Sequence, residues 1–286
     1  MQQASAPVPS RGAWRREDNT VILDEIQVPD AVPPPFAIST ESVFVTVPLE
    51  FEPHAHPVHE LVWVRGGTMT VRLADAVITV PEGHGLWIPA GVVHSGRTTA
   101  RTILSDALFD PQRSRLGAPA FAASSAVEVT PILASLLTHL ERDDLSEQER
   151  LRAESVVFDV LAPAEGQLSL RVPDAERVGP IVAALLDDPT DDRTLTEWAA
   201  LLGISERTVT RLFRAHTGLS FLQWRQVLRV HQALALLAEG LSVHEVAEVM
   251  GYAQPSTFIA SFKRVMGRTP GAYTSTSATP ARTYRA

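Results

Sequence analysis

Five of the nine histidines fall within one short segment, between residues 54 and 94. His54 and His56 are two residues apart, so on a β-strand both side chains project to the same face. Glu60 follows in the same stretch, and His94 closes the segment. Imidazole nitrogens and carboxylate oxygens are ligands for divalent transition metals, and the same groups also hydrogen-bond organic molecules. This segment is therefore the first candidate for a binding site.

The histidine segment lies within a region, from about Ser42 to Phe109, that has the pattern of short β-strands. Runs rich in β-branched residues are separated by turn signals such as Gly66-Gly67, Pro81-Glu82-Gly83 and Pro89-Ala90-Gly91. Many short strands at close spacing predict a closed β-barrel or a jelly roll.

Two spacings in this region resemble the signature motifs of the cupin superfamily. The motifs H-x-H-x3-E-x6-G and G-x5-P-x-G-x2-H are found at His54, His56, Glu60 and Gly67, and at Gly83, Pro89, Gly91 and His94. The resemblance implies a metal site whose ligands are His54, His56, Glu60 and His94. Three imidazoles and one carboxylate suit a divalent transition metal such as Ni, Fe, Mn, Co or Zn. An alternative stays open, in which the same side chains line a metal-free pocket for an organic effector.

The C-terminal part of the chain contains a helix-turn-helix pattern twice. In the stretch 242–273, Ser242 and Glu245 form a capping box, Gly251 allows a turn, and a second helix begins near Pro255. The stretch 194–218 repeats the arrangement, with a capping box, a glycine and a further N-cap at Thr194, Glu197, Gly203 and Ser205. The repetition favours a paired DNA-binding domain over two unrelated surface helices.

The outward face of each second helix is small, polar and basic, as a helix in the DNA major groove requires. We predict base contacts from Arg207, Thr210 and Arg211 in the first motif, and from Ser256, Thr257 and Ala260 in the second. Arg214, Lys263 and Arg264 are predicted to hold phosphates. A helix from Leu219 to Ala238 would join the motifs and span about 30 Å, close to the ~34 Å between successive major grooves.

Together, the two motifs and their spacing resemble the DNA-binding domain of the AraC/XylS family of bacterial transcription regulators. The matching positions are Leu201, Ser205, Arg211-Leu212-Phe213, Thr217-Gly218, Val246-Ala247, Gly251-Tyr252, Ser256, Phe258, Phe262-Lys263, Gly267, Thr269-Pro270 and Tyr273. The resemblance implies a transcription regulator rather than an enzyme, with double-stranded promoter DNA and a small-molecule or metal effector as partners. It also implies a homodimer formed by helices after the barrel, predicted here at Pro131–Leu140 and Ser146–Leu161. The alternative is that these helices pack only on their own barrel.

Two rival functions follow from the histidine segment. The stretch from His84 to Ser95 resembles the sensor domains of a nickel- and cobalt-linked branch of the AraC regulators, which implies a metal-responsive regulator with Ni, Co, Fe or Zn as the effector. A cupin metalloenzyme, an oxygenase or an isomerase, is the rival from another class. The fused pair of helix-turn-helix motifs argues against the enzyme, because a free enzyme needs no such domain.

Charge and composition agree with a DNA-binding unit attached to a sensor. The chain carries a net charge of -8, yet from Leu201 onward ten cationic side chains face four anionic ones. The absence of cysteine excludes disulfides and thiolate metal sites. Neither a signal peptide nor a run of ~18 apolar residues is present, so we expect a soluble cytoplasmic protein without a membrane segment.

The predicted fold is a two-domain α+β chain. It comprises a flexible arm (1–20), a cupin-like sensor domain of β-barrel or jelly-roll type with trailing helices (21–162), a linker (163–173), an all-α DNA-binding domain with two helix-turn-helix motifs (174–275) and a flexible tail (276–286).

Overall fold

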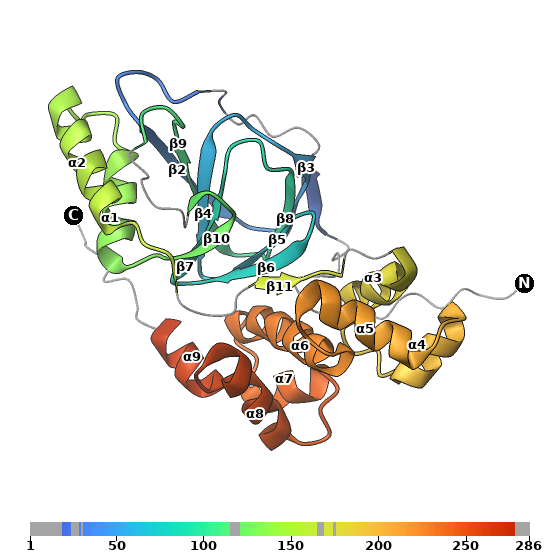
Figure 1. Ribbon diagram of the computed structural model, residues 1–286. Helices are drawn as coiled ribbons and strands as arrows, with labels where there is room; N and C mark the ends of the chain where they lie inside the picture. Colours follow the sequence, from blue (N-terminus) through green and yellow to red (C-terminus); the bar gives the residue numbers. More distant parts are fainter. Residues whose placement is uncertain are drawn as a thin grey trace, which may run out of the picture.

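The computed structural model describes residues 19–23, 29, 31–114, 121–164, 169–173 and 176–277. The predicted arm up to residue 18 and the predicted tail from residue 278 onward lie outside the described residues. Within the described part, a β-rich N-terminal domain is followed by a helical C-terminal domain, as the sequence predicts (Figure 1).

The strands of the N-terminal domain form two sheets that enclose an apolar core. The six-stranded sheet has the order β1 (Val21–Leu23), β3 (Leu49–His54), β8 (His94–Thr98), β5 (Thr68–Arg72), β6 (Ala76–Pro81) and β11 (Ser169–Arg171). The five-stranded sheet has the order β10 (Ser125–Glu128), β7 (His84–Ile88), β4 (His59–Arg65), β9 (Thr102–Phe109) and β2 (Ile38–Val45). Inward side chains of both sheets, such as Val62, Val71 and Ile78, form one buried cluster.

This arrangement confirms the jelly-roll form of the prediction, since two sheets pack face to face. The closed-barrel form is wrong for the described strands, which divide into two sheets. Strand number and turn spacing in a sequence do not determine whether the edges of a sheet meet, because closure depends on stagger and tilt between distant strands.

Two helices follow the strands and pack on the five-stranded sheet. They are α1 (Pro131–Leu140), capped by Thr130, and α2 (Glu147–Val160), which begins with a capping box at Ser146. Their apolar faces are buried against Trp87 and Phe109 of that sheet. The buried carboxylate of Glu154 also accepts hydrogen bonds from the backbone N–H groups of Ala37 and Ile38, with N···O distances of 3.0 and 3.1 Å. The helices therefore bury their apolar faces on their own domain, and the predicted homodimer contact stays a prediction.

The C-terminal domain is built around one long helix. Its elements are the short 3-10 helix η2 (Glu176–Val178), α3 (Gly179–Asp187), α4 (Leu195–Leu202), α5 (Glu206–Thr217), α6 (Phe221–Ala238), α7 (Val243–Val249), α8 (Pro255–Met266) and α9 (Pro270–Ser277). Both predicted helix-turn-helix pairs are present, as α4–α5 and α7–α8. The capping boxes at Thr194 and Ser242 begin α4 and α7, and Ser205 caps α5.

The two domains meet on the outer face of the six-stranded sheet. Strand β11 lies in the predicted linker and pairs with β6, so that Leu170 faces Val77 across the strands. Both side chains belong to the core formed by α3 to α6. The indole Nε1 of Trp224, on α6, donates a hydrogen bond to the Arg171 carbonyl at 2.7 Å. In Figure 1, α6 lies directly beneath β6 and β11.

Candidate functional site

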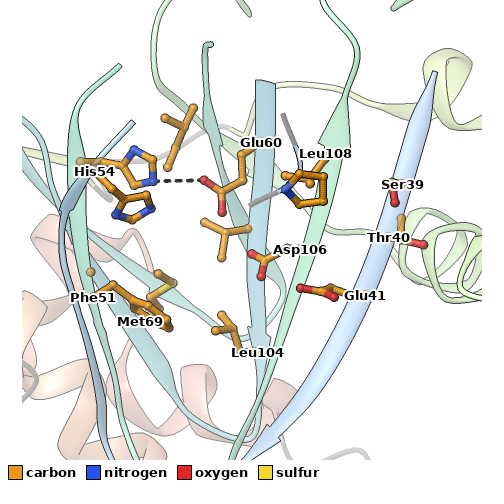
Figure 2. Close-up of a pocket in the computed structure, with 15 residues that line it drawn as sticks. Ser39, Thr40, Glu41, Phe51, His54, Glu60, Met69, Leu104, Asp106 and Leu108 are labelled. Atoms are coloured by element: carbon orange, nitrogen blue, oxygen red, sulfur yellow. Dashed lines mark ion pairs between the residues drawn. The ribbon is translucent and has the colours of Figure 1, made fainter. Parts of the chain in front are cut away.

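A cavity of about 110 Å³ opens between the two sheets. One part of its wall is apolar and another carries hydroxyl, imidazole and carboxylate groups (Figure 2). The wall is formed by Pro29, Ser39, Thr40, Glu41, Phe51, His54, Glu60, Val62, Met69, Ile88, His94, Gly96, Leu104, Asp106 and Leu108. At roughly 10–15 Å³ for each enclosed water, the space suits a molecule of about ten non-hydrogen atoms.

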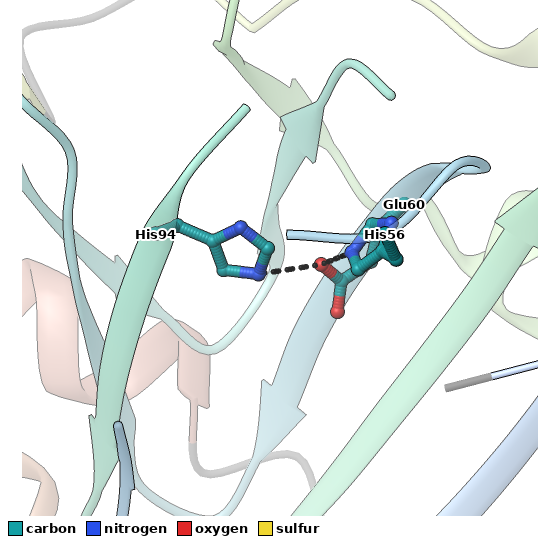
Figure 3. A group of neighbouring side chains, drawn as sticks. All are labelled: His56, Glu60 and His94. Atoms are coloured by element: carbon teal, nitrogen blue, oxygen red, sulfur yellow. Dashed lines mark hydrogen bonds and ion pairs between the residues drawn. The ribbon is translucent and has the colours of Figure 1, made fainter. Parts of the chain in front are cut away.

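Three of the four predicted metal ligands converge at the edge of this cavity. The Nε2 atoms of His56 and His94 lie 3.1 and 3.3 Å from the same carboxylate oxygen of Glu60, Oε2 (Figure 3). One ligand atom from each residue can be chosen so that all three lie within 4.8 Å of one another. The fourth predicted ligand, His54, stands beside this group, with its ring centre 4.3 Å from that of His94.

Backbone carbonyls fix the orientation of all three histidine rings. The Nδ1 atoms of His54, His56 and His94 lie 2.8, 2.7 and 2.9 Å from the carbonyl oxygens of Glu52, Val58 and Val92, respectively. Because a carbonyl oxygen only accepts hydrogen bonds, each Nδ1 carries a proton. In the neutral ring, each Nε2 therefore has a free lone pair.

This tautomer has a consequence for Glu60. With neutral rings, the Nε2 lone pairs of His56 and His94 would face the carboxylate without a proton between them. The arrangement becomes favourable when a positive charge lies at this point, either as protons on the rings or as a bound cation. A backbone carbonyl on Nδ1 and a free Nε2 is also the usual arrangement of a metal-ligating histidine. The donor set therefore fits a divalent transition metal.

The charges in this cluster are strongly coupled. Burial alone would raise the pKa of Glu60, but hydrogen bonds from His56 and His94, which these rings donate when they are protonated, outweigh burial and hold the pKa at about 2. Burial disfavours the charged form of His56, yet the hydrogen bond to Glu60 and the charge of Glu60 leave its pKa raised. At His54, burial outweighs the opposing contributions and lowers the pKa. Glu60 is thus ionised, and the cluster favours positive charge beside it.

Asp106 on β9 is a cavity residue that the sequence analysis missed. Burial, followed by the charge of Glu60, raises the pKa of Asp106 well above its ordinary value, and the two side chains hydrogen-bond. Across the neighbouring strand, Glu41 is its direct partner in the sheet register. The signal for this site was a charged residue, Asp106, between Leu104 and Leu108 in a mostly buried strand.

The predicted DNA-contacting residues lie on the exposed sides of α5 and α8. In α5, Arg207, Arg211 and Arg214 are exposed and Thr210 is half-buried, while Val209 and Phe213 are buried on the opposite side. In α8 the exposed residues are Ser256, Thr257, Ala260, Lys263 and Arg264, and the buried ones are Phe258 and Phe262. Each helix thus keeps a polar face free of the core.

One of these cations is already engaged within the domain. The Nη2 atom of Arg264 donates to the Oε1 atom of Gln226 on α6 at 2.8 Å, which restricts its reach. Two further arginines of α6 support the fold instead of facing outward. Arg225 donates to the carbonyl of Arg193, and Arg229 to the carbonyl of Pro189, both at 2.8 Å.

Comparisons with known proteins agree with this two-part architecture. A family described as a helix-turn-helix domain matches residues 198–276, and one described as an AraC-like ligand binding domain matches residues 49–105. The HTH-type transcriptional regulator NimR of Escherichia coli is 33% identical over 224 residues, which cover 77% of this chain and 81% of NimR. The regulator RipA of Corynebacterium diphtheriae is 27% identical over 75% of this chain, which spans only 60% of RipA.

Among solved structures, ToxT of Vibrio cholerae aligns with 86% of this chain and 100% of its own, at 13% identity and a TM-score of 0.36. A similarity this low carries no functional argument. The sequence relatives are transcription regulators, in agreement with the prediction that the chain is not an enzyme. Over the described residues, helices are too short or too polar to cross a bilayer.

Proposed function

The chain belongs to the AraC-type transcription regulators, and we propose that it binds promoter DNA through α5 and α8 under the control of a ligand held in the cavity between the two sheets. The observation that carries this proposal is the shared β6–β11 edge, where the cavity-bearing sheet and the core around α6 are in contact. Because that contact is direct, a change in the sheet reaches the helix that carries both reading motifs.

We assign the base contacts to Arg207, Thr210 and Arg211 of the first motif. Arginine forms bidentate hydrogen bonds with guanine, and the threonine methyl group contacts thymine. In the second motif, Ser256, Thr257 and Ala260 occupy the corresponding face but are short, so much of the specificity should come from α5 and from DNA shape. Arg214, Lys263 and Arg264 are assigned to phosphates, where they position the protein without reading sequence.

The experiment for this part selects binding sites from a random duplex library and measures the affinity of the selected duplex by fluorescence anisotropy. The predicted result is binding that exceeds binding to random DNA by a factor of ~10³ or more at physiological salt. Equal affinity for selected and random duplexes would refute a sequence-specific regulator. Because the proposed binding partner is promoter DNA, we also expect the protein to act in the cytoplasm.

For the effector, we infer that a divalent transition metal is held by His56, Glu60 and His94, with His54 as the neighbouring fourth ligand. The convergence of the Nε2 atoms on Glu60 supports this assignment. When bound, such a metal supplies a Lewis-acidic centre to which a polar group of an organic effector can coordinate. The second candidate is a metal-free pocket for an organic effector, which the apolar wall with Phe51 favours.

Elemental analysis of untagged protein separates the two candidates. We expect about one Ni, Fe, Mn, Co or Zn ion per wild-type chain after loading, and none in a His56→Ala/His94→Ala double variant. The matched control is His244→Ala, which removes an exposed histidine of α7 and should leave the metal content unchanged. If the wild-type protein holds no metal after incubation with each ion, the metal assignment is wrong and the metal-free pocket for an organic effector remains.

We further propose a homodimer through the outward faces of α1 and α2. These helices bury one face on their own sheet, yet Ile132 remains 53% exposed and Val156 39% exposed. Covering such side chains is a common reason for association between copies of one chain. Analytical ultracentrifugation of an Ile132→Asp variant tests the proposal, and an unchanged sedimentation coefficient would exclude this face as the contact.

A further inference from the structure

The outer face of the six-stranded sheet carries a polar cluster that is separate from the cavity. Side chains alternate along each strand, so Met69 and Val71 face the interior while their neighbours on β5 face outward. The outward residues form what is called here the Arg72–Arg97 cluster: Glu50 on β3, Ser95 and Arg97 on β8, and Thr70 and Arg72 on β5. They line a hollow of about 80 Å³.

The register of the three strands brings these side chains together. Arg97 is the direct partner of Glu50 on one side and of Thr70 on the other. Ser95 is the direct partner of Arg72 in the adjacent position. Directly opposed residues in a sheet are close enough for their side chains to interact. The cluster is therefore built by the backbone of adjacent strands and does not depend on a loop.

Several polar atoms of the cluster are buried without a partner among the residues that the structure describes. The Nη2 atom of Arg97 donates to Glu50 at 2.9 Å, but the Nε and Nη1 atoms are buried and have no acceptor among the described residues. The hydroxyl of Thr70 is also buried without a partner, and this side chain is only 3% exposed. Buried donors without acceptors are unfavourable, and charged ones more so.

The charges around the hollow also favour a bound anion. Two guanidinium groups share the hollow with one carboxylate, that of Glu50. Burial and then the nearby charge of Arg97 lower the pKa of Arg72. A negative group placed between them would relieve this repulsion.

We propose that the Arg72–Arg97 cluster binds a small oxyanion group, a carboxylate or a phosphate. The planar guanidinium group can bind two oxygens of either anion, carboxylate or phosphate, in a bidentate pair of hydrogen bonds. The hydroxyls of Thr70 and Ser95 add neutral donors. At roughly 10–15 Å³ per enclosed water, the hollow holds about six atoms of that size, which is close to a phosphate or a short carboxylate.

This site lies next to the contact between the domains. The carboxylate of Asp187, at the end of α3, interacts electrostatically with Arg72. An anion in the hollow competes with Asp187 for the Arg72 guanidinium, so its binding is linked to the position of α3 against the sheet. The proposal goes beyond the function assigned to the interior cavity, because none of the charged cluster residues lines that cavity.

The test measures binding of inorganic phosphate and of acetate to the full chain by isothermal titration calorimetry, at constant ionic strength. Phosphate also stabilises proteins by exclusion from their surface, so the diagnostic result is saturation at low millimolar concentration. The variants Arg72→Gln and Arg97→Gln should each weaken binding roughly tenfold or more, as loss of a charge-assisted hydrogen bond implies. The control is Arg65→Gln, which removes an exposed arginine at the end of β4.

The outcomes are distinct. Saturable binding that is lost in Arg72→Gln and kept in Arg65→Gln supports the site, and the stronger of the two anions identifies the chemical class. Binding that is equal in wild type, Arg72→Gln and Arg97→Gln would place the anion on the DNA-binding helices or show an adventitious ion only. Absence of saturable binding would also overturn the proposal. Arg72 is the more exposed of the two arginines, so its variant keeps the test valid even where Arg97→Gln fails to fold.

Discussion

Leu170 is the side chain on which the contact between the domains depends most directly. It lies on the three-residue strand β11, is 1% exposed, and is packed within the core formed by α3 to α6. The change Leu170→Ala removes three buried carbon atoms and leaves a cavity where the sheet edge meets the core. Buried leucine-to-alanine changes of this kind cost about 2–5 kcal/mol. Because β11 is short, we expect partial collapse and a value near 2–3 kcal/mol.

The assay is urea unfolding at equilibrium, followed by tryptophan fluorescence, with DNA binding measured on the same preparation. The indole of Trp224 donates to the carbonyl of Arg171, next to Leu170, so the emission of this tryptophan is sensitive to the contact between the domains. The matched control is Leu201→Ala on α4, where the leucine is 64% exposed and a change within about 0.5 kcal/mol is expected. A loss below about 1 kcal/mol in Leu170→Ala, or equal effects of the two changes, would refute the view that β11 joins the domains.

Three further predictions concern single positions. Arg211→Ala should cost about 1–3 kcal/mol in DNA binding and relax specificity at one base pair, measured by competition with mutated duplexes; uniform weakening for all duplexes would make it a phosphate contact. Burial opposes ionisation of Asp110, but bonds from Arg113 lower its pKa, so Asp110→Asn should destabilise by about 1–2 kcal/mol at neutral pH. That difference should vanish as the pH falls from the unfolded pKa of ~3.9 through the lower folded pKa, because the stabilisation is present above the unfolded pKa and is lost through the folded one; a pH-independent difference in urea unfolding would contradict it. Gly67→Ala would place a Cβ atom 2.0 Å from the Thr102 hydroxyl oxygen, so a loss of about 1–3 kcal/mol in unfolding free energy is expected, and an unchanged midpoint would show that the threonine moves freely.

Local signals predicted the C-terminal domain well. The capping boxes at Thr194 and Ser242 mark the beginnings of α4 and α7 because each box is complete within four residues. The predicted ligands His56, Glu60 and His94 also come together. The cupin-like motifs predicted this convergence because they fix the number of residues between the three positions, and these positions lie on or beside different strands.

Two features that depend on pairing between distant segments, strand β11 and the role of Asp106, were not predicted. The three-residue strand β11 has no pattern of its own, and its conformation is fixed by pairing with β6, about ninety residues earlier in the chain. For the same reason the sequence indicated a linker at residues 163–173. Asp106 was missed because a lone carboxylate in a strand acquires a role only through the neighbours across the sheet, here Glu41 and Glu60.

The strand pair β5–β6 lies between the cavity and the DNA-binding domain. In β5 and β6 the side chains alternate, so Met69 lines the cavity and its partner Val80 belongs to the core between the sheets. On the opposite side of β6, Val77 belongs to the core around α6. A ligand that displaces Met69 acts on β5 and, through the β5–β6 pair, on a strand whose other face is packed against the core around α6. Since packed cores adopt discrete arrangements more readily than continuous ones, this geometry favours a switch between two positions of α6 over a gradual tilt.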